Sequence, residues 1–102
     1  MRDSIELFLN GKKIKTAAEI LRAVANPVRF QILSFIHEQQ KANVDKICRT
    51  LQLEQSHTSQ HLKVLREANL VLTHRKGKHI FYSLNYEVMQ LLAELTQRFF
   101  SA

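Results

Sequence analysis

The segment that most constrains the fold of this chain is 44–66. Apolar residues recur at helical spacing in 44–51, a short polar turn follows, and a second helical pattern then begins. At 100° per residue, Leu62 and Leu65 fall on one side of this second pattern together with Thr58. The opposite side carries short polar side chains and cations. Two short helices joined by so tight a turn predict a helix-turn-helix.

The rest of the chain is expected to be mostly helical, because two glycines and one proline among 102 residues leave little room for loops. Asn26 followed by Pro27 predicts a helix start, since asparagine caps helices and proline fits the first helical position. Thr16 is the expected cap of the preceding helix. The predicted helices have the approximate bounds 4–10, 16–25, 27–39, 44–51, 55–68 and 86–100.

A β-hairpin is predicted over 70–84, where a basic tip that contains a glycine separates two β-prone runs. If Lys76 and Gly77 form a two-residue turn, His74 and His79 lie opposite each other. Helices, a helix-turn-helix, a hairpin and a final helix make up a winged helix. We therefore predict a mainly α protein with a small β-hairpin, which is an α+β winged helix-turn-helix fold.

Positive charge is concentrated in one part of the chain. The net charge is +6, and residues 41–82 hold eight lysines or arginines against three acidic residues. Residues 1–40 contribute +2, and residues 83–102 contribute −1. Solvated surface charge would have no reason to favour the middle segment. The distribution therefore indicates a polyanionic partner for the helix-turn-helix and the hairpin.

Length and composition exclude several classes of protein. A chain of 102 residues is expected to form one domain, 1–102, and small α-rich domains often complete their cores by dimerising. The chain is 45% hydrophobic and 24% charged, which fits neither a disordered nor a membrane protein. The N-terminus has no signal-peptide pattern, and the single cysteine cannot form an internal disulfide. We expect a cytoplasmic protein without membrane contact.

The exposed side of the predicted helix 55–68 is the candidate DNA-reading surface. Glutamine can bond adenine through two atoms, serine can bond several base edges, and lysine can bond guanine or phosphate. The hairpin cations would reach phosphates or the adjacent minor groove. The alternative is an ordinary solvated polar face. The candidates near bases are Ser56, His57, Ser59 and Gln60. The candidates on the DNA backbone are Lys63, Arg66, Arg75, Lys76, Lys78 and His79, and Gln55 is a further DNA-binding candidate without an assigned contact.

Several runs of the sequence resemble those of a known family. The runs LRAVANPVRFQIL (21–33) and SQHLKVLREANLV (59–71) resemble its opening and its recognition helix. The runs RKGK (75–78) and FYSL (81–84) are similar to its wing. The family is that of the ArsR/SmtB-type winged-helix repressors, and the resemblance covers roughly residues 16–95.

The resemblance implies a homodimeric transcriptional repressor. Such a protein would bind double-stranded DNA at an inverted-repeat operator and release it when an inducer binds. In this family the first and last helices form the dimer interface. The residues that we expect there are Ile5, Phe8, Ile20, Leu21, Val88, Leu91, Leu92, Leu95 and Phe99.

The chain departs from the family at the metal-sensing positions. The resemblance places one family site, built from thiolates, at 42–44, and these residues contain no cysteine. A second family site on the last helix uses Asp, His and Glu, whereas the matching stretch here offers Tyr86, Val88, Phe99 and Ala102. We therefore expect no metal site and no cofactor, and an inducer, where there is one, that is not a metal ion.

Several single residues invite a functional interpretation but are better explained by structure. Cys48 lies four residues inside its helix and is expected to be a small buried residue. His74 and His79 together provide too few ligands for a zinc site. His61 lies beside Leu62 and is expected to be a hydrogen-bonded structural histidine.

Two other classes of function remain as alternatives. A winged helix can serve as a protein-interaction module with weak or no DNA binding, although the basic hairpin and the polar helix face argue against it. An enzyme is not expected. The chain has no carboxylate pair, no nucleophile with a base at motif spacing and no glycine-rich phosphate loop.

Overall fold

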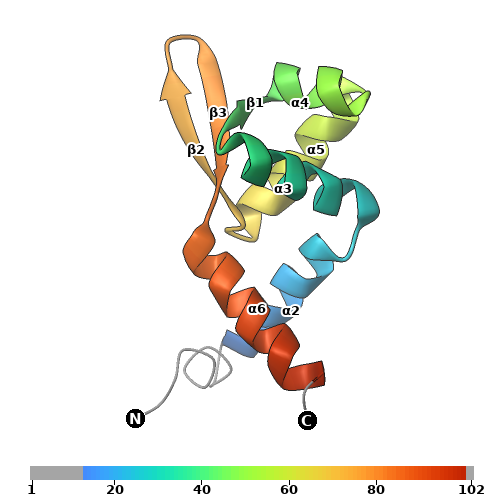
Figure 1. Ribbon diagram of the computed structural model, residues 1–102, viewed down its shortest axis with the longest axis vertical. Helices are drawn as coiled ribbons and strands as arrows, with labels where there is room; N and C mark the ends of the chain where they lie inside the picture. The colour runs from blue at the N-terminus through green and yellow to red at the C-terminus, as the bar shows by residue number, and fades with distance from the viewer. Residues whose placement is uncertain (1–12, 101–102) are drawn as a thin grey trace.

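The computed structural model describes residues 13–100, which form five helices and a three-stranded antiparallel sheet (Figure 1). Helices α4 and α5 are the predicted helix-turn-helix, and strands β2 and β3 are the predicted wing. The α+β winged-helix prediction is therefore confirmed. The predicted helix 4–10, with Ile5 and Phe8, lies outside the described residues. The elements are α2 (Lys13–Val24), α3 (Pro27–Gln39), β1 (Ala42–Asn43), α4 (Val44–Leu51), α5 (Gln55–Glu67), β2 (Val71–Lys76), β3 (His79–Leu84) and α6 (Tyr86–Phe100).

Local sequence explains where two of the helices begin. The side-chain oxygen of Asn26 accepts hydrogen bonds from the N–H groups of Val28 and Arg29, both at 3.0 Å. Pro27 occupies the first helical position of α3, as predicted. Helix α4 begins in the same way, because Asn43 accepts a hydrogen bond at 2.8 Å from the backbone N–H three residues later. Both asparagines satisfy N–H groups that a helix start would otherwise leave unbonded.

The structure corrects the start of α2. This helix already begins at Lys13, so the prediction that Thr16 caps it is wrong. Lysine and isoleucine are tolerated inside helices, and no residue between Lys13 and Thr16 stops the helix there. The left-handed turn residues Gln52 (φ 56°) and Asn69 (φ 61°) end α4 and α5 near the predicted places. Gln40, with φ 69° after α3, is a third non-glycine residue with positive φ, and it was not predicted.

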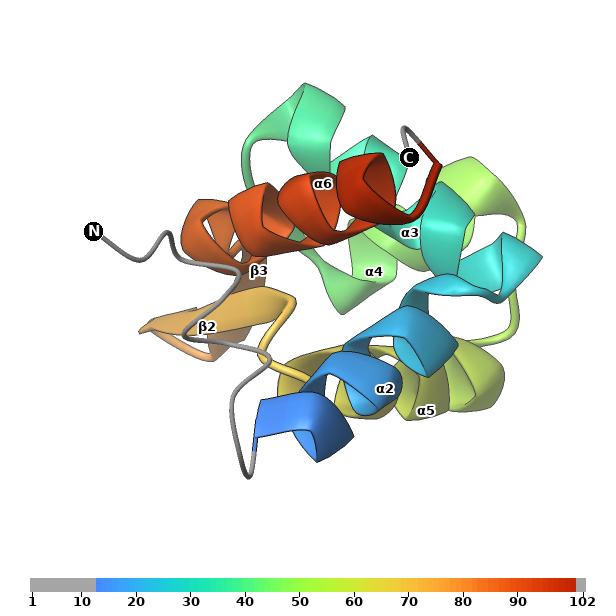
Figure 2. The same cartoon turned by 90° about the horizontal axis from the view of Figure 1, so that it is seen from below.

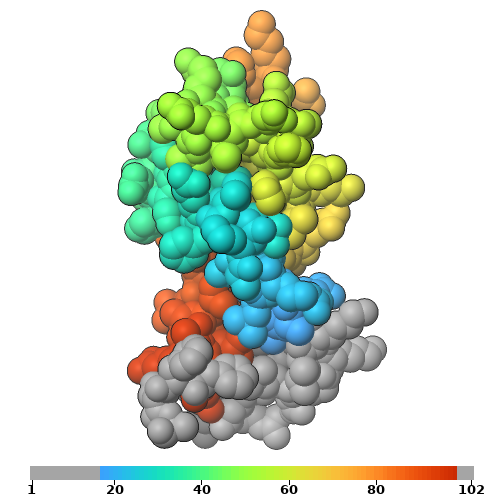
Figure 3. All heavy atoms as spheres, turned by 90° about the vertical axis from the view of Figure 1, so that its right-hand side faces the viewer, coloured from blue at the N-terminus to red at the C-terminus, as the bar shows by residue number. Residues whose placement is uncertain are grey.

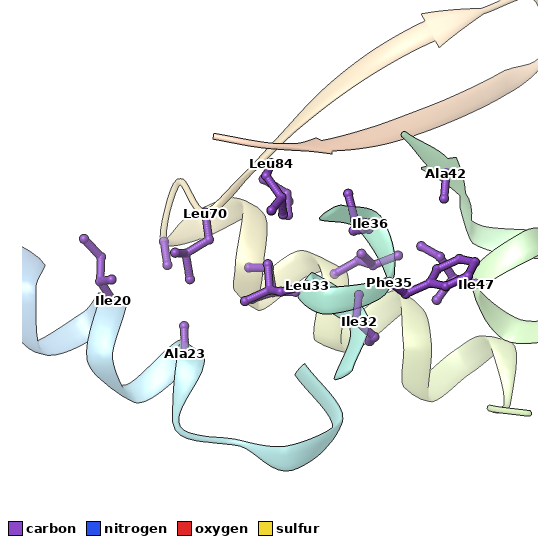
Figure 4. Close-up of a cluster of buried hydrophobic side chains, with 14 residues drawn as sticks. Ile20, Ala23, Ile32, Leu33, Phe35, Ile36, Ala42, Ile47, Leu70 and Leu84 are labelled. Carbon is purple, nitrogen blue, oxygen red and sulfur yellow. The ribbon is translucent and has the colours of Figure 1, made fainter. Parts of the chain in front are cut away.

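The core lies where α3, α4, α5 and the base of the sheet meet (Figure 4). Helix α2 contributes Ile20 and Ala23 to the same cluster. In Figure 1, α2 and α6 lie at the end of the molecule away from the hairpin tip, and Figure 2 shows that end from below. Across residues 13–100, no helix has the length and apolarity that a membrane crossing requires. The largest apolar side chains that are fully buried are Ile32, Ile36, Ile47, Leu62, Leu65 and Leu70.

The sheet has the strand order β1-β3-β2, and β3 is antiparallel to both neighbours. Strand β1 was not predicted. Its two residues, Ala42 and Asn43, pair with Tyr82 and Phe81 of β3. The same asparagine caps α4, so the pairing attaches the hairpin directly to the start of the helix-turn-helix.

The hairpin turn is shifted by one residue from the prediction. Lys76 pairs with His79, so Gly77 is the first of the two turn residues. His74 therefore faces Phe81, and the prediction that it faces His79 is wrong. Gly77 has a φ of 63°. Glycine with positive φ at the first central position is typical of the type II′ turns that match the twist of a hairpin.

Candidate nucleic-acid interface

Helix α5 is held in place by one fully buried side. Thr58, Leu62 and Leu65 are each at most 1% exposed, as their shared position on the helical pattern predicted. The Thr58 hydroxyl donates a hydrogen bond of 2.9 Å to the backbone oxygen of Glu54, so this buried polar group is satisfied. The helix is thus fixed by apolar packing along its length and by a hydrogen bond at its first turn.

The opposite side of α5 carries the predicted DNA-contacting residues of this helix. In Figure 3 the yellow-green and yellow atoms of this region lie on the open surface, and the orange tip of the hairpin projects beyond them. The arrangement leaves amide, hydroxyl, imidazole and cationic groups in solvent on one continuous helix face. The residues, all exposed, are Gln55, Ser56, His57, Ser59, Gln60, Lys63 and Arg66.

The N-terminus of α5 has an acidic residue beside it. Glu54 occupies the N-cap position, but its side chain makes no capping hydrogen bond. Its carboxylate instead lies 3.6 Å from Nδ1 of His57, and both side chains are exposed. When His57 is protonated, this contact is an ion pair that neutralises the carboxylate. The uncapped N–H groups of the first turn remain available to an anion such as a phosphate.

The hairpin presents its predicted cations on both faces and at its tip. Cross-strand partners share a face of a sheet, and side chains alternate along each strand. Lys76 and its partner His79 therefore lie on one face, and Arg75 lies on the other. Lys78 is the second turn residue. Residues 72–80 are all exposed, so the cations extend into solvent beyond the packed body of the protein.

Arg29 of α3 connects this helix to α2 and to α5. Its Nε donates a hydrogen bond of 2.6 Å to the Ala23 oxygen, and its Nη2 donates one of 3.2 Å to the Arg22 oxygen. Its Nη1 lies 3.3 Å from Nδ1 of His61. One guanidinium therefore binds the last carbonyls of α2 and a side chain of α5, and the expected structural role of His61 is confirmed.

The electrostatic environment of His61 favours the neutral imidazole. Burial lowers the pKa of His61 below its ordinary value of 6.5, and the positive charges of Arg29 and His57 lower it further. A neutral ring can keep Nδ1 unprotonated and accept the hydrogen bond from the guanidinium of Arg29. The environment of His61 therefore disfavours the proton that would prevent Nδ1 from accepting this hydrogen bond.

Two residues near this surface were missed from the sequence. Arg29 lies in the first turn of α3, close to the C-terminal carbonyls of the preceding helix, and a cation at that place can bind such carbonyls. That proximity was the available signal. Lys41 places its Nζ 5.6 Å from the centroid of the Phe81 ring, which adds a cation at the base of the hairpin. No sequence signal pairs Lys41 with Phe81, because the contact depends on the strand pairing.

The residues expected at a dimer interface differ in their exposure. Ile20 and Leu95 are buried within the chain, while Leu21 is exposed. Val88, Leu91 and Leu92 of α6 are half-buried. Ile5 and Phe8, as well as the side chain of Phe99, lie outside the part of the chain that the structure describes. Helix α6 therefore offers apolar surface, whereas α2 uses most of its apolar side for the protein's own core.

Metal-binding groups do not converge in the described part of the chain. Among residues 13–100, no three His, Cys, Asp or Glu side chains are placed to share a metal ion. Cys48, expected to be buried, is half-buried.

Known proteins share both the sequence pattern and the fold. The family described as "Bacterial regulatory protein, arsR family" matches residues 26–73, from the cap of α3 into β2. The chain is 37% identical to the transcriptional repressor PagR of Bacillus anthracis, over 67% of this chain and 68% of that protein. It is 38% identical to the transcriptional repressor SmtB of Mycobacterium tuberculosis, over 70% of this chain and 52% of that protein. The chain thus spans about half the length of SmtB.

A transcriptional activator is also similar. HlyU of Vibrio cholerae is 34% identical over 87% of this chain and 82% of that protein. Its solved structure matches with a TM-score of 0.70 at 35% identity, over 89% of this chain and 98% of the other. These relatives are regulators of transcription rather than enzymes. The chain belongs to the ArsR family of bacterial winged-helix transcriptional regulators.

Proposed function

We propose that the chain is a homodimeric repressor that binds an inverted-repeat operator through α5 and the wing. The observation that supports this proposal is the difference in burial between the two sides of α5. One side is fully buried, while the other exposes seven polar or cationic residues beside a cationic hairpin. A helix that is fixed through its buried side and exposes hydrogen-bonding side chains on the opposite side is suited to the major groove of DNA.

Some residues on this surface would contact base edges, and the others would contact the phosphate backbone. Gln60 and Ser59 would contact base edges, with Ser56 and His57 nearer the N-terminus of the helix. The cations would contact phosphates and so position the protein without specifying sequence. In this group we place Lys63 and Arg66 of α5 and Arg75, Lys76, Lys78 and His79 of the wing.

Dimerisation would supply the symmetry of the operator. We place the dimer contacts on α6 and the N-terminal helix, as the family resemblance implies, with the half-buried apolar side chains of α6 as support. Two copies of α5 would then enter successive major grooves about 34 Å apart. The named relatives include two repressors and one activator. We propose that the protein acts in the cytoplasm and that its mode of action is repression.

Selection of bound duplexes from a random DNA pool tests the proposal directly. The expected result is an imperfect inverted repeat whose half-sites are about one helical turn apart. Light scattering on the same protein should give the mass of a dimer. Selection of no sequence, together with capture of a protein partner, would contradict the proposal and favour the protein-interaction alternative.

The salt dependence of binding provides a second test. If a dimer contacts on the order of ten phosphates, its affinity should fall about 10³-fold or more between roughly 50 and 200 mM salt. A flat response would mean that the basic surface does not contact the DNA backbone.

A further inference from the structure

A cavity of about 340 Å³ lies between α3 and α6. Val24 at the end of α2 and Leu84 of β3 also line it, so four elements of the fold surround it. Leu33 and Leu84, labelled in Figure 4, are buried members of the core and also line the cavity. Cavities that bind small organic molecules have volumes of about 300–1,000 Å³, so this one is at the lower end of that range.

The wall of the cavity is mainly apolar and includes large exposed side chains. Phe30 of α3 is 60% exposed and Tyr86 of α6 is 47% exposed. Met89 and Leu92 of α6 continue the apolar wall and are half-buried against the core. Aromatic and aliphatic groups that remain open to solvent around a concave space would gain from burial against an apolar ring.

The polar groups of the cavity come from facing helices. Nδ1 of His37 on α3 lies 3.0 Å from the hydroxyl of Tyr86 on α6, and the two rings meet edge to face. Ser34 precedes His37 by one helical turn and also lines the cavity. A few convergent hydrogen-bonding groups in an apolar wall are the usual composition of a small-molecule site, where they orient the ligand.

We infer that this cavity binds a small, mainly apolar organic molecule that carries one hydroxyl group. The apolar part lies against Phe30 and Met89, and the hydroxyl bonds to the His37–Tyr86 pair. We further infer that this site is where an inducer acts, a step that rests on the proposed function. Helix α3 packs against α5, whereas α6 carries the proposed dimer contacts. A ligand wedged between α3 and α6 therefore changes the distance between the two recognition helices of a dimer.

The fluorescent probe 2-naphthol tests the binding step, since it is an apolar bicyclic ring with one hydroxyl. The chain contains no tryptophan, so the emission of the probe can be followed without interference from that residue. The expected result is saturable binding, with NMR shift changes centred on Phe30, His37 and Tyr86. Absence of saturation, or shift changes elsewhere, would overturn the inference.

A cavity-filling variant keeps the test specific. Ser34 is exposed on α3, so Ser34→Phe adds a ring that occupies the cavity without removing a core side chain. We expect it to weaken naphthol binding at least about tenfold. Gln31→Phe is the matched control, because it adds the same ring at an exposed position of α3 outside the cavity lining and should bind as the wild type does. Equal binding by both variants would overturn the assigned site.

The remaining alternative is that a second copy of the chain covers the cavity. In that case naphthol binding would fall over the range of protein concentration in which light scattering shows that the dimer forms. Such a result would overturn the inference. If the cavity stays open in the dimer, binding is independent of protein concentration.

The regulatory step has its own readout, which is the affinity for the selected DNA with and without naphthol. We expect a change of at least about fivefold in the wild type and none in Ser34→Phe. Naphthol binding with unchanged DNA affinity would overturn the regulatory step. A chain that binds naphthol but selects no DNA would refute only the proposed function. A chain that selects DNA but never binds naphthol would refute only this inference.

Discussion

Helix α5 and the β2–β3 hairpin both belong to the proposed DNA-binding surface, but they differ in how much of each is packed against the core. One side of α5 is fully buried along its length, whereas Leu72 and Ile80 of the hairpin are 51% and 43% exposed and its tip has no packing behind it. The core therefore determines where α5 lies, but only the base of the hairpin is fixed. A fixed helix suits contacts with base edges, which need accurate placement, and a projecting hairpin suits long cations on phosphates.

The largest expected effect comes from truncating a buried apolar side chain of α5. Leu62 is 1% exposed, and Leu62→Ala should lower the free energy of unfolding by about 2–5 kcal/mol, because it removes apolar contacts and leaves a cavity. Ile80→Ala is the matched truncation in the hairpin and should cost less than about 0.5–1 kcal/mol. Urea denaturation of both variants measures the difference. Similar losses in the two variants would show that the hairpin is part of the cooperative core.

The second expected effect distinguishes a residue that contacts bases from one that contacts phosphates. Gln60→Ala should weaken binding to the selected operator by about 1–3 kcal/mol and relax the base preference at one position. Lys76→Ala should weaken binding to all sequences and reduce the salt dependence by about one released counterion. Both side chains are exposed, so unfolding should change little. A uniform loss with Gln60→Ala, or a loss of base preference with Lys76→Ala, would reverse the roles that we assign.

The same two regions differ in how well their structure could be predicted from the sequence. Helical spacing placed Thr58, Leu62 and Leu65 on the buried side of α5, because that pattern depends only on neighbouring residues. The hairpin was predicted, but its register was not. A glycine between two lysines allowed two adjacent turns, and the choice between them is made by strand pairing and by the φ of Gly77.

Contacts between residues distant in the sequence were not predictable. Strand β1 has only two residues, which is too short for an alternating pattern, and it exists because β3 lies beside it. Arg29 and His61 are 32 positions apart, and only the packing of α3 on α5 brings them together. Periodicity predicted the buried and the exposed side of α5, whereas the Arg29–His61 contact and the β1 pairing depend on the tertiary fold.

A third expected effect concerns the hairpin turn. Gly77 has a φ of 63°, and beyond its two chain neighbours no heavy atom lies within 4 Å of the place where a Cβ would be, so Gly77→Ala should introduce backbone strain without a clash. We expect a local cost of about 1 kcal/mol, seen as faster amide exchange in the hairpin, with a smaller change in global unfolding. Gly77→Asn should cost less, because asparagine tolerates positive φ. Equal exchange in all three proteins would mean that the turn contributes nothing to the placement of the hairpin.

The smallest expected effect concerns the protonation of His61 and its influence on the pH dependence of stability. The pKa of His61 is lowered by burial and by the charges of Arg29 and His57, whereas the unfolded chain titrates near the ordinary value of 6.5. Below about pH 6.5 the unfolded chain takes up a proton at this position more readily than the folded chain does. The contribution of His61 to stability is therefore present above about pH 6.5 and is lost as the pH falls.

His61→Gln tests this argument, because the glutamine oxygen can still accept the hydrogen bond from Arg29 but does not titrate. Denaturation at about pH 7.5 and about pH 5.5 should show a smaller loss of stability on acidification in this variant than in the wild type. His74→Gln in the exposed hairpin is the control and should retain the wild-type loss. If His74→Gln removes the pH dependence and His61→Gln does not, the hairpin is coupled to folding more closely than α5. The contrast between a fixed helix and a projecting hairpin would then be wrong.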